Sequence, residues 1–142
     1  MSRQLCTFRV GSYLYGIDVL EVQEMISYQA STRVPLAPPE LRGLINLRGQ
    51  IVPAIDLRRR LGLEDAPPDS LPMNVIVRTT SGAVSFLVDD IGDVVEVDEV
   101  LVDSVPQTVP AGAREFVSAV HKFDTELLHE LNTAGAVAGI VA

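Results

Sequence analysis

The chain is built from short segments in which apolar and polar residues alternate, each closed by a turn. Alternation runs through residues 6–10, Gly11-Ser12 provides a turn, and alternation resumes through residues 13–19. Because successive side chains of a strand point to opposite faces, this pattern predicts a hairpin. Further strands are indicated at 44–47, 50–57, 75–77, 84–88, 94–97, 116–123 and 126–133. Closely spaced strands with frequent turns favour small β-barrels, so a mainly β fold is expected.

Two stretches depart from this alternation. The apolar residues of 19–26 recur at helical spacing and predict a helix of about two turns. Residues 58–61 can form one helical turn that Gly62 ends. Pro35, Pro38 and Pro39 impose an extended segment between these stretches, because proline lacks a hydrogen-bond donor and restricts the residue before it.

The segment Glu64–Pro72 holds three prolines and three acidic residues among nine, which is typical of a linker. We therefore predict one five-stranded barrel from 1 to 63 and another, with a C-terminal tail, from 73 to 142. The two halves also look alike, since residues 50–57 match 126–133. This likeness indicates an old duplication, or else a chance similarity between two β-rich segments.

Charge and composition exclude several classes of function. The net charge of -8 repels phosphate, so nucleic acid and anionic membranes are not expected partners. Cys6 is the one cysteine, which rules out an intrachain disulfide and fits a reducing compartment. The first residues lack the apolar core of a signal peptide, and no apolar run reaches about 18 residues. A cytoplasmic location is expected.

The titratable residues do not form a convincing catalytic site. His129 and Glu130 are adjacent in a predicted strand and point to opposite faces, so we interpret them as an exposed or edge-strand polar pair, and His121 as solvated. The alternation around Cys6 favours a buried structural thiol over a nucleophile. Asp89-Asp90 and Asp93 fit a solvated turn better than a cation site. No enzymatic activity, metal or cofactor is expected, although a small β-barrel enzyme is an alternative.

Three segments resemble the CheW family of chemotaxis coupling proteins. Residues 38–58, with Asn46-Leu47-Arg48-Gly49-Gln50-Ile51-Val52-Pro53 at their centre, are similar to the family's signature. Residues 15–26 resemble its first-barrel pattern and residues 86–94 its second-barrel hairpin. The central run is specific, and the resemblance extends from Leu5 to about Thr133.

This resemblance implies two SH3-like five-stranded barrels packed side by side, with a few short helices and no catalysis. It implies that the chain binds the regulatory domain of the histidine kinase CheA and the cytoplasmic tips of chemoreceptors (methyl-accepting chemotaxis proteins). The receptor's helical hairpin would lie in an apolar groove between the barrels, within membrane-associated receptor arrays. Other CheW copies are further possible partners. The final strand differs from the family pattern at His129 and Glu130, which motivates an alternative, a scaffold-only paralogue in kinase-free rings.

Five residues match family positions implicated in receptor or kinase binding: Val22, Glu24, Gly43, Arg48 and Val94. Glu24 and Arg48 could form an ion pair or remain two solvated charges. Gly43 could be needed for a positive φ angle or for direct contact with a partner. Val22 and Val94 could be ordinary core residues.

The loop from Val102 to Pro110 is a further candidate partner surface, because Pro106 and Pro110 stiffen it.

Overall fold

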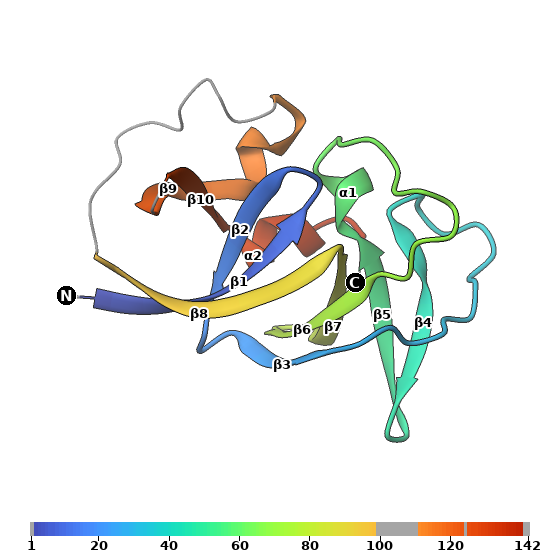
Figure 1. The fold of residues 1–142 in the computed structure, drawn as a ribbon. Coiled ribbons are helices and arrows are strands. Elements are labelled where there is room, and N and C mark those ends of the chain that lie inside the picture. Colours follow the sequence, from blue (N-terminus) through green and yellow to red (C-terminus); the bar gives the residue numbers. More distant parts are fainter. Residues whose placement is uncertain (1, 99–110, 124, 141–142) are drawn as a thin grey trace.

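The computed structural model describes residues 2–98, 111–123 and 125–140, and it forms two five-stranded sheets (Figure 1). In sheet order, sheet 1 contains β8 (Asp90–Asp98), β1 (Ser2–Val10), β2 (Tyr13–Asp18), β10 (Glu126–Leu131) and β9 (Val117–Phe123). Sheet 2 contains β3 (Val22–Ile26), β6 (Met73–Thr79), β7 (Gly82–Val88), β5 (Gln50–Asp56) and β4 (Leu41–Leu47). The helices are short: α1 (Leu57–Arg60), the 3-10 helix η1 (Ala111–Phe116) and α2 (Thr133–Val137). The predicted fold class is confirmed.

Each sheet combines a hairpin from one half of the chain with three strands from the other. The β1–β2 hairpin joins β8, β9 and β10, while the β6–β7 hairpin joins β3, β4 and β5. The predicted barrel boundaries, 1–63 and 73–142, are therefore wrong, because the two halves exchange their first hairpins. Residues 64–72 do not link two barrels, since they lead from α1 to β6 and β5 and β6 both belong to sheet 2.

The two halves repeat one order of strand pairing. In each sheet, the hairpin from the other half of the chain joins the sheet through one parallel strand pair. This pair is β2 with β10 in sheet 1 and β7 with β5 in sheet 2. In each half the last strand leads into a short helix whose N-cap side chain accepts a backbone N–H, Asp56 for α1 and Asn132 for α2. This shared connectivity is what a duplication produces.

The sheets share one apolar core. Phe8 and Tyr15 of sheet 1 belong to the same buried cluster as Val75 and Phe86 of sheet 2. Each sheet also encloses a smaller cluster on its other face. In sheet 1 that cluster holds four buried residues, Leu5, Leu14, Val97 and Leu128. No helix among the described residues is long and apolar enough to cross a membrane.

Residues 19–26 do not form the predicted helix: residues 19–21 make a turn, and β3 follows from Val22 to Ile26. β3 pairs antiparallel with β6, and a register shift between Val22 and Glu24 interrupts the alternation. A β-bulge of this kind places two residues opposite one, so apolar residues on both sides of it recur at a spacing that imitates a helix.

The prediction that His121, His129 and Glu130 are exposed is also wrong, because all three are buried. His129 Nδ1 lies 2.9 Å from the carbonyl oxygen of Leu14, and His121 Nε2 lies 2.9 Å from Glu130 Oε1. Arg3 donates to both carboxylate oxygens of Glu130, at 2.6 and 2.7 Å. These buried polar groups are tolerated because each has a partner: His121, Glu130 and Arg3 satisfy one another, and His129 bonds to the Leu14 carbonyl. Cys6 is buried, as predicted.

Candidate functional site

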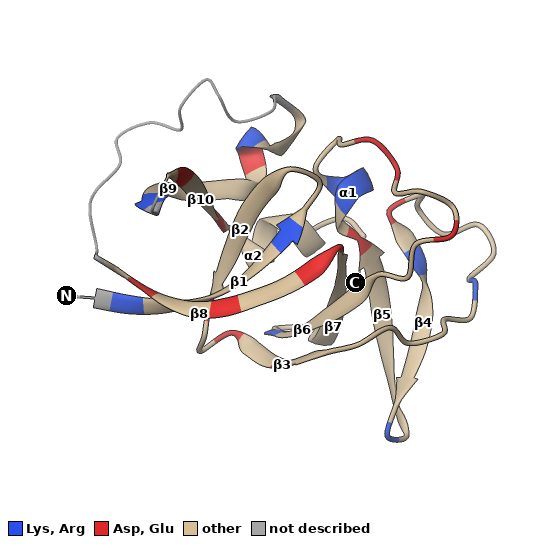
Figure 2. Cartoon of the chain, in the orientation of Figure 1, with Lys and Arg blue, Asp and Glu red and all other residues tan. Residues whose placement is uncertain are grey.

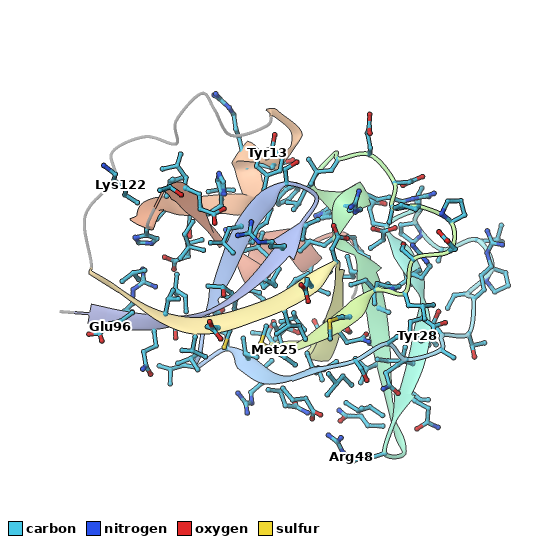
Figure 3. All side chains as sticks on the ribbon, viewed as in Figure 1. Tyr13, Met25, Tyr28, Arg48, Glu96 and Lys122 are labelled. Atoms are coloured by element: carbon cyan, nitrogen blue, oxygen red, sulfur yellow. The ribbon has the colours of Figure 1, made fainter. Side chains whose placement is uncertain are left out.

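Glu24 and Arg48 form an ion pair at the seam where sheet 2 curls on itself. β3 and β4 are the two edges of this sheet, yet Arg48 Nη2, at the tip of the β4–β5 hairpin, donates to Glu24 Oε2 on β3. The segment after β3 also reaches β4, since the backbone groups of Thr32 and Leu44 exchange two hydrogen bonds of 2.8 Å. Figure 3 shows Arg48 at this tip. Of the two alternatives for these charges, the structure shows the ion pair.

The hairpin tip places Arg48 through an unusual backbone conformation. Leu47 pairs with Gln50, so the loop has two residues, Arg48 with φ 50° and Gly49 with φ 87°. Two successive positive φ angles match a type I′ turn, which suits the twist of a hairpin. Asn46 Oδ1 accepts a hydrogen bond of 2.9 Å from the Gly49 N–H. An arginine is unfavourable at a positive φ angle, which indicates that its side chain serves another purpose.

Both charges of the pair are held in their ionised forms. The hydrogen bond from Arg48 lowers the pKa of Glu24, and the hydrogen bond to Glu24 raises the pKa of Arg48. The two side chains remain open to solvent, Arg48 more so than Glu24. An exposed pair contributes little to folding but presents a fixed charge pattern to a partner.

Val22 and Val94 occupy different sheets and differ in burial. Val22 begins β3, is half-buried and packs against the shared core. Val94 lies on β8, the edge strand of sheet 1, and is 51% exposed, so it is not a core residue. The structure therefore places Val22, Glu24 and Arg48 on sheet 2 and pairs Glu24 with Arg48, whereas Val94 belongs to the other sheet.

Gly43 does not need a positive φ angle, contrary to one of the two roles predicted for it. A Cβ atom at this position would lie 2.5 Å from the carbonyl oxygen of Thr32. Glycine is required because the segment after β3 passes directly over β4. Gly43 thus supports the same seam that the Glu24–Arg48 pair spans.

An open hollow of about 450 Å³ lies beside the β2–β3 turn, between the start of β1 and β8. It is lined by Arg3, Gln4, Asp18, Val19, Leu20 and Glu96. Leu20 is 81% exposed, two residues before Val22, and the sequence analysis did not single it out. A leucine between Asp18 and Glu21 in a turn is the signal that could have identified it.

Arg58 connects the two sheets at the β1–β2 turn, the end of that hairpin away from the hollow. It donates to both carboxylate oxygens of Asp89, at 3.0 and 2.6 Å, and Asp89 also accepts from the Gly11 N–H at 2.6 Å. The prediction that Asp89 lies in a solvated turn is therefore wrong. Its carboxylate joins α1 to the β1–β2 turn. Asp90 and Asp93 are exposed, as expected. The hydrogen bond to Asp89 raises the pKa of Arg58, so this link stays charged.

The arrangement is suited to binding a protein surface. It offers exposed or half-exposed aliphatic residues on two strands, a fixed ion pair, and a hollow between β-strands. Over residues 2–98, 111–123 and 125–140, no group of three His, Cys, Asp or Glu residues could hold a metal ion. The candidate surface at Val102–Pro110 lies outside the described residues.

Comparisons with known proteins agree on one family. The family model for the CheW-like domain matches residues 4–139. The chemotaxis protein CheW of Treponema pallidum is 33% identical over 129 residues, covering 88% of this chain and 76% of that protein. CheW of Bacillus subtilis is 32% identical, covering 89% and 81%. The crystal structure of the scaffolding protein TtCheW from Thermoanaerobacter tengcongensis superimposes with a TM-score of 0.80 at 28% identity, covering 92% of this chain and 89% of that one.

Proposed function

The chain belongs to the CheW-like domain family of chemotaxis proteins, and on that premise we propose that it is a non-catalytic adaptor. It couples the cytoplasmic tips of chemoreceptors to the histidine kinase CheA, in arrays at the cytoplasmic side of the membrane. The observation that carries this proposal is the Glu24–Arg48 ion pair at the seam of sheet 2, on the strand that begins at Val22.

The receptor is proposed to bind through its helical hairpin. An amphipathic helix docks on aliphatic side chains with few buried charges, and Val22 and Val94 supply such side chains on edge strands of the two sheets. Glu24 and Arg48 fix the orientation of the partner, because charges at the margin of an apolar contact govern specificity more than affinity. The kinase binds through its regulatory domain.

The test is a binding titration with two partners, the regulatory domain of CheA and a receptor cytoplasmic fragment. The wild-type protein is expected to bind at about micromolar affinity or tighter. Val22→Lys and Arg48→Glu are each expected to weaken binding of one partner at least about tenfold, since each places a wrong charge at the contact. Lys122→Glu reverses an exposed charge on β9 and serves as the control. A folded wild-type protein that binds neither partner would refute the proposal.

A further inference from the structure

One asparagine is buried among the aliphatic side chains of sheet 2. Asn74 lies on β6 and is fully buried, and its face of the sheet also carries the buried Ile76 and Leu87. Asparagine is disfavoured in strands, and an aliphatic side chain at this position would contribute more to stability by its burial. A buried polar group of this kind is better explained by the arrangement that it specifies than by stability.

The amide of Asn74 connects two other segments through hydrogen bonds. Ser85, on the central strand β7, donates its hydroxyl to Asn74 Oδ1 at 2.7 Å. Asn74 Nδ2 in turn donates to the carbonyl oxygen of Ser27 at 3.0 Å. Ser27 comes directly after β3, where the chain leaves β6 and crosses to β4. The amide therefore ties the end of an edge strand to the interior of the sheet.

The register of β3 decides which way Glu24 points. β3 is an edge strand of five residues, and a register shift interrupts its pairing with β6. Val22 and Met25, on the two sides of this shift, both pack against the shared core. Ile26 lies opposite Asn74 and packs against the smaller cluster on the other face, so Glu24, two residues earlier, points to that face as well. A slip of one residue would turn Glu24 toward the shared core.

We propose that Asn74 is the positioning residue of the Glu24–Arg48 pair. By holding Ser27, it fixes β3 beyond the register shift, so that Glu24 stands opposite the guanidinium at the tip of the β4–β5 hairpin, the blue tip in Figure 2. Because Asn74 is fully buried, it reaches a partner only through the residues that it positions. The inference deepens the proposed adaptor function and rests on it for binding, whereas the geometry of the pair can be tested without a partner.

The partner-free test is the titration of Glu24, followed by carboxyl-carbon NMR with Glu24→Gln identifying the resonance. The hydrogen bond from Arg48 lowers the pKa of Glu24, so Arg48→Asn, which removes the donor, defines the full rise in this pKa. Asn74→Val supplies a side chain suited to a strand but breaks the link to Ser27. It should produce at least about half of that rise. Ser85→Ala is a milder change and should raise the pKa of Glu24 in the same direction.

Val52→Ala is the matched control. Val52 is buried in the small cluster that contains Ile76, so this change opens a cavity there and removes no hydrogen-bonding group. It should lower the stability of the protein and leave the pKa of Glu24 at its wild-type value. If Asn74→Val does not fold, Ser85→Ala decides alone. The proposal is overturned if the folded variants at positions 74 and 85 leave this pKa unchanged, or if Val52→Ala raises it equally.

A double-mutant cycle measures the consequence for binding. With the partner that Arg48→Asn affects, Asn74→Val alone should weaken binding at least about threefold. Adding Arg48→Asn to Asn74→Val should then weaken binding by no more than about threefold further, because the pair is already displaced. Losses that multiply independently would show that Asn74 does not act through the pair. If wild type binds neither partner, the adaptor function fails, while the titration still decides whether Asn74 positions Glu24.

Discussion

Arg48 combines a strained backbone with an exposed ion pair, and these two properties can be separated by one substitution. Asparagine adopts positive φ angles more readily than arginine, so Arg48→Asn should keep the β4–β5 turn intact. The same change removes the guanidinium that donates to Glu24. We expect an unfolding free energy equal to or above that of wild type, together with binding to one partner weakened about tenfold. Urea denaturation and a binding titration measure the two effects.

Gly49→Ala is the matched change at the neighbouring position. Its φ of 87° disfavours alanine, so this variant should lose about 1 kcal/mol of stability while keeping the Arg48 side chain. If Gly49→Ala weakened binding in the folded state as much as Arg48→Asn, the turn rather than the ion pair would determine binding.

Glu130 makes the stability of sheet 1 depend on pH. Burial raises the pKa of Glu130, but hydrogen bonds from Arg3 and His121 outweigh burial and hold the pKa below its usual value. A folded-state pKa below the unfolded one means that the stabilisation is complete above about pH 4.3 and is lost as the pH falls through the folded pKa. We expect the unfolding free energy of wild type to fall more steeply between about pH 5 and pH 3 than that of Glu130→Gln.

The same variant has a second expected effect at neutral pH. Glu130→Gln replaces the carboxylate that accepts two hydrogen bonds from the half-buried Arg3 guanidinium, while Asp18 Oδ2 stays 3.7 Å from it; the loss of these two charged hydrogen bonds should cost about 2 kcal/mol. Urea denaturation at a series of pH values measures both effects. Parallel pH profiles for wild type and variant would show that Glu130 titrates alike in the folded and unfolded states.

The sequence predicted some residue roles and missed others for a physical reason. The Glu24–Arg48 pair was one of two alternatives, and the resemblance to family positions brought the two residues together. The network of Arg3, His121 and Glu130 was missed, because strand alternation assigns a side chain to a face but does not say which face is covered. That depends on β1 and β9 lying in the same sheet as β10.

Among the elements, the crossing of β4 by the segment after β3 depends on Gly43. A methyl group there would meet the Thr32 carbonyl oxygen at 2.5 Å, and backbone cannot yield as a flexible side chain can. Gly43→Ala should therefore destabilise the protein by about 2 kcal/mol, measured by urea denaturation. Binding per folded molecule should change little, because the glycine itself presents no side chain. Unchanged stability with impaired binding would instead make Gly43 a direct contact.

Elements were predicted best where a glycine closes a hairpin. The alternation before and after Gly11 gave β1 and β2 because both strands are regular around that turn. The sequence predicts a helix at β3 because the register shift between Val22 and Glu24 removes the period of two over a strand of only five residues.

For the whole molecule, two five-stranded barrels and an internal repeat were predictable from strand spacing, whereas the exchange of hairpins was not. The local sequence pattern of residues 2–18 does not indicate that β1 and β2 pair with β8 and β10 instead of β3. Such pairing follows from long-range packing, in which Phe8 and Tyr15 share a core with residues from both halves. The composition of the Glu64–Pro72 segment is therefore that of a linker, although the segment joins two parts of one sheet.

The exchange predicts how the protein responds to a cut in that segment. Cleavage at a protease site placed between Asp65 and Pro68 would divide the protein into an N-terminal piece ending near residue 65 and a C-terminal piece starting near residue 68. Each sheet needs strands from both pieces. Because the shared core and the Arg58–Asp89 link also cross the cut, the pieces should remain together through gel filtration. Separated in urea, neither piece should regain native near-ultraviolet circular dichroism alone, and mixing should restore it. Pieces that part in native buffer, or one that folds alone, would contradict the exchanged topology.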